Sequence, residues 1–148
     1  MPLLFRFRAL TGGLLACLLL LALPAVVPAD AEPAGGGPEQ VYGFGLHLFR
    51  LGDYYRAVTE LKRFTLLFPQ HRQHDAAQVL IGLALQSDAA YDDALAHYQW
   101  LSQFNGETHA AQVAAFKLGE IPFSQGQYRL SARNWQRFLN NAPRGPLA

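Results

Sequence analysis

The sequence contains few of the features that mark an enzyme or a metal-binding protein. Cys17 is the only cysteine in 148 residues, so no disulfide can form within the chain. It has neither a Gly-x-Ser-x-Gly segment nor a pair of carboxylates in a recognisable catalytic frame. We therefore expect no catalytic residues, no metal and no cofactor, and we predict that the protein is not an enzyme.

Neither sign of charge dominates. Twelve basic residues stand against eleven acidic ones, for a formal net charge of +1. Removing residues 1–31 would take away Arg6, Arg8 and Asp30 and leave ten of each sign. A balanced chain of this kind lacks the electrostatic attraction that nucleic-acid binding needs. We expect a protein or peptide partner and no nucleic acid.

Residues 1–31 have the pattern of a secretory signal peptide. Arg6 and Arg8 precede an almost wholly apolar run over residues 9–27, and Ala29-Asp30-Ala31 supplies the small-x-small motif of a cleavage site. The pattern predicts cleavage after Ala31 and an exported protein.

Two alternatives for the N-terminus remain open. The apolar run approaches the roughly 20 residues that a membrane anchor needs, although Gly12, Gly13 and Pro24 weaken it. The segment from Leu14 to Cys17 also resembles a bacterial lipoprotein signal, although four leucines follow where small polar residues are usual. Either an uncleaved or a lipidated N-terminus would associate the protein with a membrane.

After a glycine-rich linker over residues 32–38, the chain repeats itself every 37 residues. Seven positions recur in three successive units with consistent chemistry. They are Gly45, Gly82 and Gly119; Gly52, Ala89 and Gly126; Tyr54, Tyr91 and Tyr128; Ala57, Ala94 and Ser131; Leu61, Tyr98 and Trp135; Phe64, Leu101 and Phe138; and Pro69, Gly106 and Pro143.

This spacing predicts three pairs of antiparallel helices in an all-α fold. We expect close helix packing where small residues recur, a turn at the second glycine column, and a buried stripe from the tyrosine and large apolar columns. Pro122 should kink or shorten the helix that contains it. The packing residues are Gly45, Ala57, Gly82, Ala94, Gly119 and Ser131. The predicted helices cover residues 39–51, 54–68, 75–88, 91–104, 110–124 and 127–141.

The repeated columns resemble the tetratricopeptide repeat. The likeness covers three units, at 39–71, 75–108 and 110–143, followed by a tail at 144–148. It departs from the family in its longer period and in having Val41, Gln78 and Ala115 where a tryptophan is common. The resemblance implies a right-handed α-solenoid whose first helices line an inner groove.

Residues 52–69 are also similar to the repeats of two groups of bacterial envelope proteins. One is the outer-membrane assembly lipoprotein that helps insert β-barrels, and the other is the periplasmic repeat protein associated with the Tol-Pal system. Both act by holding partners, so the resemblance implies a periplasmic scaffold of the cell envelope, with a membrane-anchored form as the alternative.

The repeat family also implies which residues line the groove. They form a mainly apolar and aromatic surface that suits an amphipathic helix or an apolar segment of a partner. The alternative is that these residues pack against their own neighbours or the N-terminal linker. They are Tyr42, Leu46, Phe49, Arg50, Val79, Leu83, Gln86, Phe116, Glu120 and Phe123.

Two further clusters have a structural and a functional interpretation. Arg129, Arg133 and Arg137 fall four residues apart, so they share one face of the helix. This face is either exposed to solvent without a further role or a contact for anionic lipid or an acidic partner. His71, His74 and Asp75 could be zinc ligands, but we expect a loop with Asp75 as the next N-cap.

The last predicted helix carries more apolar surface than one partner helix can cover. Its apolar residues suggest that a partner or a second copy covers the end of the array, giving a homo-oligomer through the C-terminal repeat. These residues are Tyr128, Leu130, Trp135, Phe138 and Leu139.

Overall fold

A computed structural model describes residues 36–103 and 108–141 of the chain. This part is all-helical and contains no strand, which confirms the predicted fold class. The predicted signal segment 1–31, the possible lipidation site Cys17 and the tail 144–148 lie outside the described residues. The helices are α1 (Pro38–Arg50), α2 (Tyr54–Leu67), α3 (His74–Ser87), α4 (Tyr91–Gln103), α5 (His109–Ser124) and α6 (Tyr128–Asn141).

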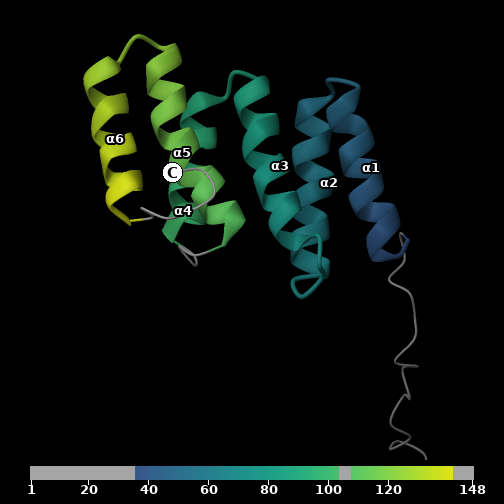
Figure 1. The fold of residues 1–148 in the computed structure, drawn as a ribbon. Coiled ribbons are helices and arrows are strands. Elements are labelled where there is room, and N and C mark those ends of the chain that lie inside the picture. Colours follow the sequence, from purple (N-terminus) through teal and green to yellow (C-terminus); the bar gives the residue numbers. More distant parts are fainter. Residues whose placement is uncertain (1–35, 104–107, 142–148) are drawn as a thin grey trace, which may run out of the picture. The chain divides into compact units, whose positions relative to one another are not determined.

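Each helix begins and ends within one residue of the range expected from the repeats. Within residues 36–103 and 108–141, each helix packs against the next in chain order (Figure 1). The first helices of successive pairs also touch, since α3 contacts both α1 and α5. Among the described residues, no two of α2, α4 and α6 contact one another. This order is compatible with a helical-repeat array.

The three turns within the pairs have the same backbone. Gly52, Ala89 and Gly126 adopt φ of 78°, 59° and 76°, in the left-handed region. In each turn two backbone N–H groups donate to carbonyls of the helix just ended. Glycine adopts this conformation freely, whereas Ala89 must place a Cβ there.

The recurring glycines lie where two helices of a pair approach. A Cβ at Gly45 would come within 2.9 Å of Leu61 Cγ. At Gly82 it would overlap the Tyr98 ring, and at Gly119 the indole of Trp135. The same two columns of the repeat therefore meet in all three pairs, and only glycine leaves room for the large side chain opposite.

The tyrosine column is not part of the buried stripe, so that expectation was wrong. Tyr54 is half-buried, whereas Tyr91 and Tyr128 are exposed. Each tyrosine is the first residue of its helix, which places its ring over the turn and not over the core. Tyr54 meets Phe49 edge-on at 5.6 Å between ring centroids, and Tyr128 meets Phe123 at 5.5 Å.

The buried residues fall into two clusters. One joins α1, α2 and α3 around Leu61, Phe64 and Ile81. The other joins α4 and α5 around Tyr98, Leu101 and Ile121. Because α3 contributes partly buried residues to both, the pairs share one continuous apolar interior.

Pro122 was expected to kink or shorten its helix, and it does not shorten it. α5 continues to Ser124, and Pro122 itself is buried. Proline has no N–H to donate to the carbonyl four residues earlier, which here belongs to Leu118. Asn134 of α6 replaces that donor, since its Nδ2 lies 2.7 Å from the Leu118 oxygen. The neighbouring helix thus satisfies the carbonyl that the proline leaves free.

We expect Asn134→Ala to destabilise the protein by about 1–3 kcal/mol, because it removes the only substitute donor for a partly buried carbonyl. In a Pro122→Ala background the helix regains its own N–H, so the same change should cost much less. Urea unfolding of both single variants and the double variant measures this coupling. Additive effects would show that Asn134 does not compensate for the proline.

Ser131 occupies a position that is alanine in the other two pairs. It is 1% exposed, and its hydroxyl has no hydrogen-bond partner among the described residues. We expect Ser131→Ala to raise the free energy of unfolding by about 1 kcal/mol, because a buried unpartnered hydroxyl is lost. Ser102→Ala, which removes a hydroxyl bonded to the Gln99 carbonyl, is the control. A lower urea midpoint for Ser131→Ala would contradict the prediction.

Candidate functional site

The residues predicted to line a groove lie on the three first helices, α1, α3 and α5. Arg50, Phe116 and Phe123 are exposed. The others are half-buried, and Tyr42 and Val79 pack against the two core clusters. The first helices touch in the order α1, α3, α5, and the hydrogen bond between Gln86 and Glu120 joins the α3 and α5 members of the set. We call this set of ten residues the first-helix face.

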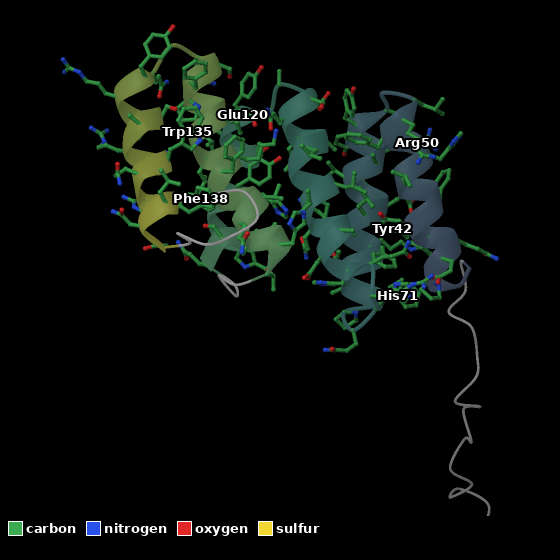
Figure 2. The ribbon with its side chains drawn as sticks, viewed as in Figure 1. Tyr42, Arg50, His71, Glu120, Trp135 and Phe138 are labelled. Carbon is green, nitrogen blue, oxygen red and sulfur yellow. The ribbon has the colours of Figure 1, made fainter. Side chains whose placement is uncertain are left out.

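On α1 the aromatic side chains of this face pack partly against the second helix of their own pair, α2. Tyr42, which is labelled in Figure 2, lies 5.4 Å from Phe64 of α2 between ring centroids. Phe49 contacts Tyr54. Leu46, which lies between Tyr42 and Phe49 in the sequence, is half-buried. Arg50 is the last residue of the helix and is exposed to solvent. This end of the first-helix face offers less free aromatic surface than the sequence suggested.

The centre of the first-helix face is polar. Gln86 of α3 donates from Nε2 to Glu120 Oε1 of α5 at 3.4 Å, and Lys117 Nζ lies 2.7 Å from the same oxygen. The Tyr98 hydroxyl reaches Gln86 at 3.5 Å. Burial, and then the Glu120 carboxylate, raise the pKa of that hydroxyl. The tyrosine therefore stays neutral and acts as a hydrogen-bond donor.

Lys117 and the Tyr98 hydroxyl were absent from the sequence-based site. The spacing of Lys117, three residues before Glu120 on one helix, could have revealed this ion pair. The link from Tyr98 through Gln86 to Glu120 joins α4, α3 and α5, and no spacing within a single helix predicts it.

The end of this face on α5 carries an aromatic cluster. The Phe116 ring stacks on Trp135 at 6.0 Å between centroids, and Phe123 lies 5.6 Å from the same indole. The Trp135 Nε1–H donates to the Phe116 carbonyl at 3.1 Å, which holds the indole in place. Phe116 and Phe123 still expose 37% and 52% of their surface. This cluster is the most exposed aromatic part of the first-helix face.

The loop histidines are engaged in pairs and do not form a metal site. His71 Nε2 lies 3.0 Å from Glu39 Oε2, and Arg72 contacts the other oxygen of that carboxylate at 3.1 Å. Figure 2 shows His71 beside the start of α1. His74 Nδ1 lies 3.4 Å from Asp75. Within residues 36–103 and 108–141, no three histidine, cysteine or acidic residues are grouped so that they could hold a metal ion.

Asp75 is not the N-cap of its helix, so that prediction was wrong. α3 begins at His74 and is capped by Gln73 without a side-chain hydrogen bond. The helix starts one residue earlier than expected, which places Asp75 inside the first turn. A carboxylate there still interacts favourably with the helix dipole.

The three arginines of α6 do not share one environment. Arg129 and Arg133 border an open depression at the start of the helix. Arg137 instead lines a pocket of about 570 Å³ between α4, α5 and α6. The sequence contained no signal for this pocket, because it depends on the separation of α4 from α6.

His97 has a structural role between α4 and α3. Its Nε2 lies 2.8 Å from the Gln78 carbonyl oxygen. Burial lowers the pKa of the ring, although this hydrogen bond partly offsets the effect. The histidine therefore favours its neutral form and ties the second pair together.

No helix in the described part of the chain is long and apolar enough to cross a membrane. Comparison of the chain with protein-family models and with curated protein sequences finds no match.

Proposed function

We propose that this protein is an exported, non-enzymatic scaffold of the bacterial cell envelope that binds a protein or peptide segment on its first-helix face. The proposal includes a tetratricopeptide-type repeat, a cleaved signal at residues 1–31 and a periplasmic location. An uncleaved or lipidated N-terminus would instead hold the same scaffold at a membrane.

The observation that carries the proposal is the contact of α3 with both α1 and α5, while the second helices do not touch one another. A single partner segment that followed the line of first helices would meet side chains from three repeats. Since the face is built on helices that are packed on both sides, little of it needs to become ordered on binding.

The chemistry of the first-helix face suits a segment with both apolar and polar side chains. Phe116 and Phe123 offer exposed aromatic surface, of the kind that anchors many protein interfaces. Glu120 and Gln86 lie beside these rings and provide hydrogen-bonding groups. An amphipathic partner could bury its apolar side on the aromatic cluster and direct its polar side to this pair.

We expect Leu83→Asp to weaken partner capture about tenfold or more, since it places a carboxylate on the apolar part of the face. Circular dichroism should remain helical, because Leu83 is only half-buried. Leu66→Asp is the matched control, as Leu66 is 80% exposed on α2. The measurement is the amount of protein retained from an envelope extract by each immobilised variant. Equal retention by the two variants would overturn the proposed binding face.

Self-association is a second candidate, favoured by the surface of α6. Among the described helices, α6 contacts only α5, whereas α2 and α4 each contact two helices. Tyr128, Leu130 and Leu139 are exposed, whereas Phe138 is buried and Trp135 half-buried. Exposed apolar surface of this kind favours association. Light scattering coupled to size exclusion distinguishes the cases, because a monomer at high micromolar concentration would exclude self-association as the function.

A further inference from the structure

The pocket between α4, α5 and α6 is lined by apolar and polar side chains from all three helices. We call its α5 side, which includes Ala111, Ala115 and Leu118, the floor, and its α4 and α6 sides the walls. Its volume of about 570 Å³ lies within the roughly 300–1,000 Å³ of typical ligand sites. It lies between α4 and α6, which do not contact one another, and none of its lining residues belongs to the first-helix face.

Side-chain amides stand on both walls. Gln99 and Gln103 come from α4, and Asn134 and Asn141 come from α6. Each amide can both donate and accept hydrogen bonds. An extended peptide presents unpaired N–H and C=O groups along both of its edges, whereas a helix satisfies its own. Two amide-bearing walls therefore suit an extended segment better than a helical one.

The floor also contains an acceptor that has no donor. The side-chain oxygen of Gln112 is out of contact with solvent and accepts no hydrogen bond from the described residues. Gln112 lines the pocket, and its side chain would have to turn for this oxygen to meet a backbone N–H of an occupant. Buried polar groups are rarely left unpaired, because the loss of hydration is then not offset.

Arg137 is the only charged residue among the described residues that line the pocket. No ion pair joins it to an acidic residue in the described part of the chain. A guanidinium binds a carboxylate through two parallel hydrogen bonds, and it does so more strongly beside an apolar surface than in open water. The charge of the pocket therefore favours an acidic occupant.

We propose that this pocket is a second binding site, which takes an extended peptide segment with apolar side chains and one carboxylate. The floor receives the apolar side chains, the wall amides pair with the peptide backbone, and Arg137 binds the carboxylate. This site is independent of the proposed first-helix face.

The test uses the full chain and an array of acetylated hexapeptides built from leucine, valine and alanine. One position of each peptide holds aspartate, asparagine or lysine. We expect retention to fall in that order, with aspartate peptides bound at least about tenfold more than lysine peptides. Arg137→Glu should reverse the preference toward lysine. Ala115→Trp, which fills the pocket, should abolish binding of all three sets.

Arg133→Glu is the matched control, because Arg133 lies on the same helix but outside this pocket. It should keep the preference for aspartate. Equal retention of the three peptide sets, or an unchanged preference in Arg137→Glu, would overturn the proposal. So would binding that is seen only after residues 142–148 are removed, because the chain itself would then be the occupant. Circular dichroism of each variant establishes that it is folded.

Discussion

Gly82→Leu is expected to unfold the helical array or to lower its free energy of unfolding by about 3 kcal/mol or more. Even a Cβ at this position would overlap the ring of Tyr98. That ring is fully buried and holds a hydrogen bond to Gln86, so it has little freedom to move aside. The middle pair also connects the two core clusters, so its loss should affect both neighbours. Thermal and urea unfolding followed by circular dichroism measure the effect.

Gly43→Ala is the matched control for this change. Gly43 is also a helical glycine, but a Cβ there would meet nothing within 4 Å. Alanine is favoured over glycine in a helix by about 1 kcal/mol, so this variant should be more stable than the original protein. A second variant, Gly82→Ala with Tyr98→Leu, should recover part of the loss seen with Gly82→Ala alone. If Gly43→Ala proved the more damaging change, the assigned helix faces would be wrong.

Phe64→Ala is expected to destabilise the protein by about 3–5 kcal/mol, near the upper range for a core phenylalanine. Phe64 is fully buried and lies within 6 Å of three other rings, those of Tyr42, Phe68 and His71. These groups belong to α1 and to the loop after α2. The residues around Phe64 are therefore held by separate elements and cannot readily move into the cavity that the substitution leaves.

Phe138→Ala removes the same residue from the same repeat position and should cost less, about 2–3 kcal/mol. Phe138 is 5% exposed, and α6 has only α5 beside it. Such a helix can shift toward its neighbour and reduce the cavity. Equilibrium unfolding of both variants in urea gives the comparison. A larger loss for Phe138→Ala would show that another element covers α6 in solution.

The helical pairs were predictable from the sequence because each repeated column has one physical role. Gly45, Gly82 and Gly119 each face a large side chain that lies sixteen residues later in the sequence. Because this spacing is the same in all three units, the repeat itself indicates which two positions are in contact. The effect of Pro122 was not predictable in this way. It depends on Asn134, which reaches the Leu118 carbonyl from another helix. The local effect of a proline predicts a kink or a shortening, and α5 is not shortened.

Much less of the candidate site could be predicted. Helical spacing places Phe116, Glu120 and Phe123 on one helix face. It does not show that the rings of Phe116 and Phe123 pack against Trp135 of the next helix. The hydrogen bond between Gln86 and Glu120 joins α3 to α5 across 34 residues. The pocket beside Arg137 depends on the distance between two helices that never touch. Properties of this kind arise only when the elements are assembled.

The contact of α3 with α1 and α5, together with the separation of α2, α4 and α6, gives the array two sides of unequal stiffness. Bending that spreads the second helices apart breaks no direct contact between them. Bending that parts the first helices must open their shared packing. We therefore expect thermal motion to bend the array with the first helices as the hinge, so that the second helices move toward or away from one another. In particular, we expect the spacing of α4 and α6, and with it the width of the pocket between them, to vary more easily than the spacing of the first helices.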